Sequence, residues 1–317
     1  MEFTLKNKNS GGYTLLLFSI TIFVSSWLLF WIQPLFTKNI LPILGGSPSV
    51  WNTAMVCFQI LLLTGYWYAD LLTKIRFPNI QAVLHVAITA IALSWMWIAS
   101  ADISNLEEAH VNPISWEIYT LFVHVAVPFF LLATTSTLIQ RWYASIRANE
   151  DVYWLYIVSN IGSMLGVVGF IALIEPFIGL SLQAQLFKWC FSFFAFLLIC
   201  CSFCYGRKQI VCNQITADTS KLSWATKLRW LLLSAVPSGL LLGTTTHITM
   251  DIAPVPLLWM LILALYLISF MVAFSKWRRI SLAIFLKIQM LLCVPLLFEF
   301  FLDILASAGL SMMLWHM

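Results

Sequence analysis

The sequence predicts an all-α membrane protein, a polytopic transmembrane helical bundle of about 9–10 spans with its N-terminus in the cytoplasm. Three observations carry this prediction. Of the 317 residues, 61% are hydrophobic and 9% are charged, whereas soluble domains carry roughly 25% charged residues. The apolar residues gather in runs of about 20, the length that crosses the hydrocarbon of a bilayer. The basic residues gather between these runs, where they set the orientation.

The apolar runs predict one integral membrane domain over residues 1–317. The first run is too long for a signal-peptide core of roughly 7–15 residues, so we expect it to be retained as a helix. A short apolar piece at 303–317 leaves a partial span open. The predicted spans are 14–36, 49–72, 80–100, 116–139, 153–174, 184–205, 230–248, 255–274 and 280–300.

The basic residues predict the orientation in the membrane. With the N-terminus inside, most of the 17 Lys and Arg residues fall on the cytoplasmic side. The connection at 101–115 contains acidic residues but neither Lys nor Arg, as is typical of an external loop. Positive residues concentrate in cytoplasmic loops. We therefore expect a multi-pass protein of the cytoplasmic (inner) membrane, and the net charge of +4 is no argument for a nucleic-acid partner.

Two predicted spans contain a proline followed by a Thr-rich segment. Pro128 precedes LLATTSTLIQRW, and Pro237 precedes LLLGTTTHITMDI. The segments share the pattern LL-[AG]-T-T-[ST], and in the predicted topology they run in opposite directions. Inverted repeats of interrupted helices indicate the central site of a transporter. A chance match in a chain rich in Ser and Thr is the alternative.

Polar side chains within or next to the spans are the candidates for binding a small molecule. Such residues are costly in hydrocarbon and usually face the protein interior or a cavity. Asn160 lies between Ser159 and Ser163, in a stretch whose Gly162-x-x-x-Gly166 spacing favours close helix packing. The candidates are Asp70, His124, Asn160, Glu175, His247 and Asp251.

Most of these candidates also have a structural interpretation. Asp70 is predicted near the cytoplasmic end of its span, and Glu175 and Asp251 are predicted at the outer face. All three carboxylates are either cation ligands or solvated helix ends. His124 is either a proton relay or a hydrogen-bonded structural histidine. The Asn160 amide either contacts a ligand or makes an interhelical hydrogen bond.

No cofactor, metal site or catalytic residue is predicted. Cys200, Cys201 and Cys204 have no His or acidic residue between them, so their pattern favours apolar packing over a metal site. The sequence contains no GxSxG, HExxH, Walker or GxGxxG motif, so we expect no enzyme. A membrane-embedded enzyme that acts on a lipid-linked substrate, with His124, His247 and Asp251 as candidates, is the weakest alternative.

Three segments carry a resemblance to a known family. They contain the patterns QPL…LGGSPxVW within 30–72, YxLYxxSNxGS…EPxxGLxxQ within 151–189 and THxTxDIAxxPLLW within 229–274. Over most of residues 14–275 the chain is similar to the membrane region of bacterial fused major-facilitator-like/spermidine-synthase-like proteins. The resemblance leads one to expect a further aminopropyltransferase-like domain with a Rossmann-type fold after the helices, as in the fused proteins. The 317 residues carry no Rossmann glycine fingerprint, so that chemistry is not carried over.

The resemblance and the outer acids favour one function over two others. We expect a transporter-like protein that handles a small cationic metabolite, such as a polyamine. A non-catalytic membrane subunit or scaffold for a separately encoded protein is the main alternative, and the lipid-enzyme reading is the weaker one. The expected partners are the lipid bilayer and, depending on the alternative, a small-molecule ligand or a membrane or cytosolic protein.

Overall fold

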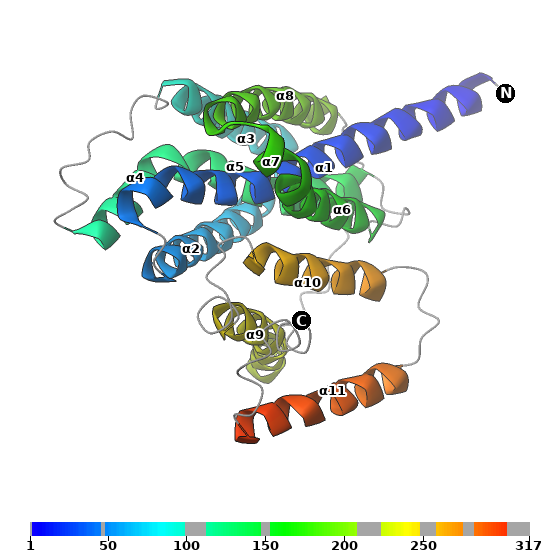
Figure 1. Cartoon of the computed structure of the whole chain (residues 1–317). Helices are drawn as coiled ribbons and strands as arrows, with labels where there is room; N and C mark the ends of the chain where they lie inside the picture. The colour runs from blue at the N-terminus through cyan, green and yellow to red at the C-terminus, as the bar shows by residue number, and fades with distance from the viewer. Residues whose placement is uncertain are drawn as a thin grey trace. The chain divides into compact units, whose positions relative to one another are not determined.

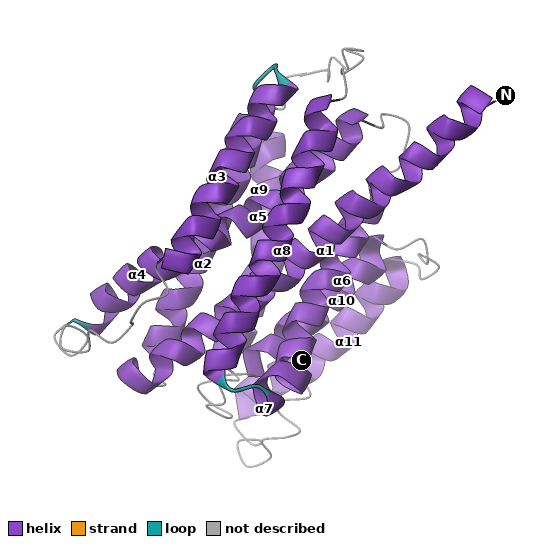
Figure 2. Cartoon of the chain, turned by 90° about the horizontal axis from the view of Figure 1, so that it is seen from above, coloured by secondary structure: helices purple, strands orange, loops and turns teal. Residues whose placement is uncertain are grey.

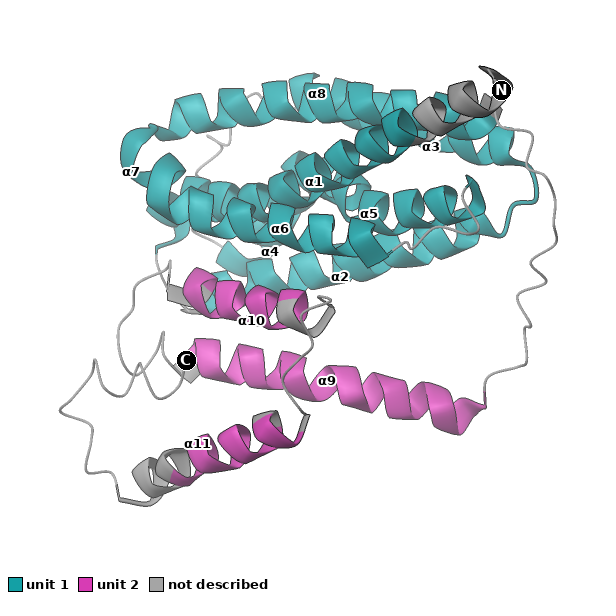
Figure 3. Ribbon diagram, turned by 90° about the vertical axis from the view of Figure 1, so that its right-hand side faces the viewer, with its two compact units in different colours: residues 1–211 teal, residues 212–317 magenta. Residues whose placement is uncertain are grey.

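A computed structural model describes residues 2–45, 48–98, 112–146, 153–207, 223–247, 258–274 and 282–302. Within these ranges almost every residue is helical, and no strand occurs (Figure 2). The all-α prediction is therefore confirmed for the described part. The chain forms two compact units, residues 1–211 and residues 212–317, which are coloured separately in Figure 3.

The first unit contains most of the helices (Figure 1). A π-helical turn, η1, continues α6 directly and leads into the short α7. The elements are α1 (Glu2–Leu44), α2 (Pro48–Thr73), α3 (Pro78–Ile98), α4 (Pro113–His124), α5 (Ala126–Ile146), α6 (Tyr153–Gly169), η1 (Phe170–Ile174), α7 (Glu175–Phe177) and α8 (Leu180–Arg207).

The second unit contains α9 (Trp224–His247), α10 (Leu258–Phe274) and α11 (Leu282–Leu302). Helices α9 and α10 contact each other. Helix α9 continues through Pro237, although a proline lacks the N–H group that the helix would use at this position.

Six described helices are long and apolar enough to cross a membrane, which indicates a multi-pass membrane protein. They correspond to the predicted spans 14–36, 49–72, 80–100, 153–174, 184–205 and 230–248. Predicted span 116–139 is divided between α4 and α5, span 255–274 contains the shorter α10, and span 280–300 overlaps α11. The six helical segments are Gly12–Leu44, Ser49–Thr73, Pro78–Ile98, Tyr153–Phe177, Leu180–Gly206 and Trp224–Thr246.

The core of the first unit lies around α1 and α5. Helix α1 packs against α5, α6 and α8, while α5 also packs against α2 and α3. Phe18, Ile22 and Leu28 of α1 and Leu131 and Leu138 of α5 have no exposed surface. The sides of the helices that face away from this core are also apolar, as expected where lipid is the solvent.

Glycines bring α1 and α6 into backbone contact. A Cβ atom placed on Gly162 would lie 2.6 Å from the carbonyl oxygen of Phe23, and one on Gly166 would lie 2.8 Å from that of Trp27. These distances leave no room for a side chain. The predicted Gly162-x-x-x-Gly166 packing face is therefore confirmed, with α1 as its partner.

The break between α4 and α5 has a local cause. The two helices bend by 62° at Val125. Pro128 lacks the N–H group that would donate to the His124 carbonyl, and its ring would clash with that carbonyl in a continuous helix. The neighbouring Val125 and Phe129 amides still donate to Leu121 and Val125, both at 2.9 Å. Predicted span 116–139 is thus two helices with a proline-directed bend.

Candidate functional site

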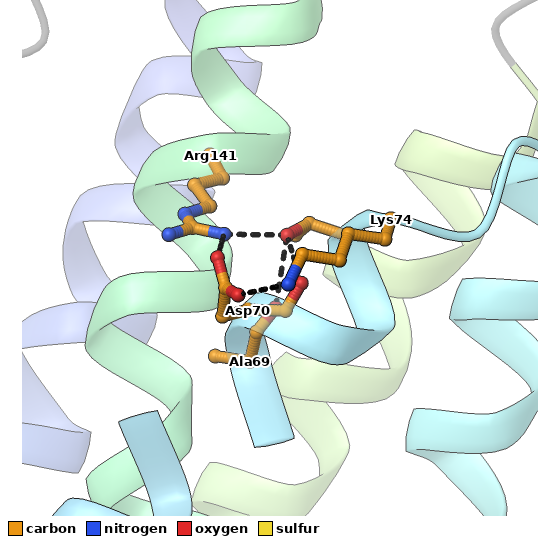
Figure 4. A network of polar contacts seen from close by, with 5 residues as sticks. Ala69, Asp70, Lys74 and Arg141 are labelled. Carbon is orange, nitrogen blue, oxygen red and sulfur yellow. Dashed lines mark hydrogen bonds and ion pairs between the residues drawn. The ribbon is translucent and has the colours of Figure 1, made fainter. Parts of the chain in front are cut away.

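Asp70 lies in the last turn of α2 and is held by two cations (Figure 4). Its Oδ2 atom is 2.7 Å from the Lys74 ammonium group, and its Oδ1 atom is 3.1 Å from the Arg141 guanidinium group of α5. Arg141 also donates to the Thr73 hydroxyl group. The Asp70 side chain is 43% exposed. This carboxylate joins α2 to α5 at a helix end, which matches its structural interpretation.

A buried polar cluster lies at the same end of the helices and is centred on Gln81 of α3. The Gln81 amide nitrogen donates to the Ile75 carbonyl at 2.6 Å. Its amide oxygen accepts hydrogen bonds from the Trp142 indole at 3.0 Å and the Tyr205 hydroxyl at 3.2 Å. The Trp142 and Tyr205 rings are stacked, with centroids 4.6 Å apart. One side chain thus ties the α2–α3 turn to α5 and α8.

His85 lies one turn from Gln81 and is fully buried. Its ring stacks against Tyr68 of α2, with centroids 6.1 Å apart, and meets the edge of Trp142 at 5.8 Å. Neither ring nitrogen of His85 has a hydrogen-bond partner among the described residues, and the Tyr68 hydroxyl also has none there. The surroundings of this histidine are aromatic and apolar, which favours the neutral imidazole.

Asn160 is buried in α6, and its amide donates to the Tyr156 carbonyl of the same helix at 2.9 Å. The interhelical contacts nearby come from serines. The Ser159 hydroxyl lies 2.8 Å from that of Ser26 in α1 and 3.2 Å from that of Ser136 in α5. These hydrogen bonds connect three helices of the core, which is the packing role expected of small polar residues in membranes.

Glu175 begins α7 and forms an ion pair with Lys38 of α1. The second carboxylate oxygen, Oε2, is buried and has no hydrogen-bond partner in the described part of the chain. Close by in sequence, the fully buried Gln183 donates to the Ile178 carbonyl at 2.7 Å and closes the turn between α7 and α8. The carboxylate of Glu175 is therefore neutralised by a lysine of the chain itself.

The four predicted candidates of the first unit lie on different helices. Asp70 lies at the end of α2, whereas Lys38 and Glu175 lie near the end of α1, where α2 begins. His124 is the last residue of α4 and takes part in an interaction. His247 ends α9, but its side chain lies outside the described structure, as does Asp251 entirely.

Glu117 of α4 is a buried acid that sequence reasoning missed. It has no exposed surface. Neither carboxylate oxygen makes a hydrogen bond of normal geometry to a described residue, and the backbone of Ala54 in α2 is close enough only for a weak one. Cys57, one turn further along α2, is the titratable group beside it. The signal available in the sequence is an acid one turn after Pro113, inside the apolar run.

Glu117 and the helix break lie in one interrupted span. Glu117 precedes the bend at Val125 by two turns on α4, and α4 packs against both α2 and α5. A buried carboxyl group without a hydrogen bond of normal geometry is a functional candidate, because burial of such a group is costly.

Searches against protein-family models, curated proteins and solved structures gave no match.

Proposed function

We propose that the chain is a multi-pass membrane transporter for a small solute. The observation that carries this proposal is the interrupted span α4–α5, which bends by 62° and buries Glu117 without a hydrogen-bond partner in the described structure. Broken helices in a membrane occur where the freed backbone lies in protein or lines a water-filled cavity. Helices of this kind form the binding sites of many transporters.

The orientation and the membrane belong to the same proposal. The distribution of Lys and Arg supports a cytoplasmic N-terminus and a location in the inner membrane. The apolar runs support further spans around α10 and α11, for a total of about 9–10. The motifs shared with the membrane region of the fused major-facilitator-like/spermidine-synthase-like proteins support membership of that family.

A small organic cation, such as a polyamine, is the proposed class of substrate. The chain's own ammonium groups already occupy two of the predicted carboxylates, since Lys38 pairs with Glu175 and Lys74 pairs with Asp70. A primary ammonium group at the end of a polyamine has the same chemistry as these lysine side chains. A cationic substrate would therefore bind by displacing a lysine from its carboxylate.

Uptake of labelled spermidine into proteoliposomes tests the proposal. We expect saturable uptake by the wild-type protein and strongly reduced uptake by the double variant Glu175→Gln/Asp251→Asn. Lys38→Gln removes the competing ammonium group and is expected to lower the apparent KM. Lys227→Gln, which changes an exposed lysine beside Trp224, is the matched control and should behave as wild type.

Two results would count against this proposal. Uptake no greater than that of the double variant would rule out polyamine transport through these acids. A separately encoded protein that co-elutes in mild detergent, together with an absence of uptake, would favour the scaffold alternative.

A further inference from the structure

The buried carboxyl group of Glu117 has surroundings that do not support a negative charge. Its side chain has no exposed surface, and neither oxygen makes a hydrogen bond of normal geometry to a described residue, the Ala54 backbone offering only a weak one. Asp70 and Glu175 differ, because each pairs with basic side chains. An ionised carboxylate without compensation in an apolar interior is so unfavourable that the group takes up a proton.

The groups that face Glu117 do not change this conclusion. On α2 its neighbours are the Ala54 backbone and the Cys57 thiol. The influences that the structure records on the carboxyl group are its burial and the Ala54 backbone, and no charged side chain of the described residues is among them. A thiol beside a carboxyl group offers no positive charge, so nothing in this part of the chain would balance the carboxylate anion.

The position of Glu117 connects its protonation to a movable element. The acid lies on the short α4, which is separated from α5 by the bend at Val125. Because the two helices are not one rod, α4 can change its angle against α2 as a unit of its own when its packing against α5 and α1 shifts with it. Such a change would bring the carboxyl group into contact with water, where it releases its proton.

We propose that Glu117 is a proton-binding site, which holds a proton while α4 packs against α2 and releases it to water when α4 moves away. The exchange is a simple dissociation, in which the carboxylic acid O–H bond breaks, its electron pair stays on the carboxylate and the proton passes to water. The inference rests on the proposed function in one respect, namely that movement of α4 belongs to a transport cycle.

Infrared spectroscopy of the full-length protein in lipid tests the protonation directly. We expect the carbonyl band of a protonated carboxylic acid at neutral pH in the wild type, its loss in Glu117→Gln, and its retention in Glu175→Gln. We also expect the band to shift in heavy water, because a binding site exchanges its proton. An unchanged spectrum in Glu117→Gln, or a band that does not shift in heavy water, would overturn the proposal.

A chemical measurement on the wild-type protein avoids any folding defect of the variant. Dicyclohexylcarbodiimide is apolar and reacts with protonated carboxyl groups, whose O–H adds across one C=N bond to give an acylisourea that rearranges to an acylurea of the same mass. Peptide mass spectrometry should find one such adduct at Glu117 and none at Asp70 or Glu175. Modification of the two ion-paired acids with none at Glu117 would overturn the proposal.

Transport separates this inference from the proposed function. An outward-directed proton gradient, imposed across proteoliposomes that contain labelled spermidine in the medium, should increase uptake several-fold in the wild type and not in Glu117→Gln. An adduct at Glu117 without any uptake would support the proton site and contradict the transporter proposal. Gradient-driven uptake that persists in Glu117→Gln would support the transporter and overturn the role of Glu117.

Discussion

The contact of α1 with α6 and the contact of α2 with α4 treat buried polar groups in opposite ways. In the first, Ser26 and Ser159 satisfy each other at 2.8 Å, and Gly162 lets the backbones touch. In the second, the Glu117 carboxyl is buried without a hydrogen-bond partner in the described structure, on a helix that ends at a bend. Separation of α1 from α6 would only lose contacts. Separation of α4 from α2 would let the Glu117 carboxyl form hydrogen bonds with water.

This difference indicates that the first unit contains a rigid pair of helices and one helix that can move. Close packing with satisfied hydrogen bonds gives a rigid pair of helices, because any separation loses contacts without a gain. An unsatisfied buried group stores free energy that a local rearrangement can release. We therefore expect α1 and α6 to form the frame and α4 to be the element that moves.

The largest effect is expected for Gly162→Ala, which breaks the frame. The new Cβ atom would lie 2.6 Å from the Phe23 carbonyl oxygen, so the helices must separate, at a cost of about 3 kcal/mol. Thermal unfolding of the purified protein in detergent measures the loss. Gly169→Ala is the control, because nothing lies within 4 Å of that position. Equal unfolding temperatures for the two variants would show that the contact of α1 with α6 is not rigid.

The next effect is expected for Gln81→Leu, which removes a buried polar group that is satisfied. The substitution removes the hydrogen bonds that Gln81 makes with the Trp142 indole, the Tyr205 hydroxyl and the Ile75 carbonyl, at a cost of about 2 kcal/mol. Chemical denaturation monitored by tryptophan fluorescence measures it. The exposed Gln59 provides the control, and Gln59→Leu should leave the midpoint unchanged. A neutral result for Gln81→Leu would mean that the cluster does not hold the helices together.

A change of opposite sign is expected for Glu117→Met, which removes the unsatisfied carboxyl group at similar volume. The free energy of unfolding should rise by about 1 kcal/mol, because no hydrogen bond of normal geometry is lost and a buried polar group disappears. Glu175→Met, which breaks the pair with Lys38, should give no such gain. Measured by the same denaturation, a loss of stability in Glu117→Met would show that the carboxyl group has a stabilising partner and would remove the contrast between the two contacts.

The smallest effect is expected for Asp70→Asn at the exposed end of α2. Loss of the pairs with Lys74 and Arg141 should lower the free energy of unfolding by less than about 1 kcal/mol, because surface ion pairs contribute little. The difference should shrink further at high salt, where exposed charges are screened. A loss as large as that of Gly162→Ala would place Asp70 in the frame.

Much of the fold was predictable because the membrane restricts it. Long apolar runs must be helical where no water can satisfy the backbone, so six predicted spans correspond to long helices. The break in span 116–139 was harder to predict. Pro128 is associated with a bend, whereas α9 continues through Pro237, so the residue type alone does not decide the outcome.

The polar sites were less predictable, because apolar side chains cover both faces of these helices. An amphipathic pattern tells which face of a soluble helix is buried, but lipid-facing residues erase that contrast. The sequence around Glu117 therefore has no amphipathic pattern that would have predicted its contact with α2. The pairing of Asp70 with Arg141 spans 71 positions, which no local pattern indicates. For the Asn160 amide, the sequence predicted either a ligand contact or an interhelical hydrogen bond, whereas in the structure it donates to the Tyr156 carbonyl of its own helix.

The π-helical turn at Phe170–Ile174 has a geometric consequence for the acid that follows it. A π turn is equivalent to one extra residue in an α-helix, and each residue rotates the helix by about 100°. The turn thus sets the direction of Glu175 independently of Gly162 and Gly166 upstream. If the same residues wound as a regular α-helix, Glu175 would be rotated by about 100° away from Lys38. Deletion of the exposed Ala172 would instead remove the extra residue, restore regular winding and keep both the contact with α1 and the direction of Glu175. The direction in which Glu175 points therefore depends on the winding of the helix before it.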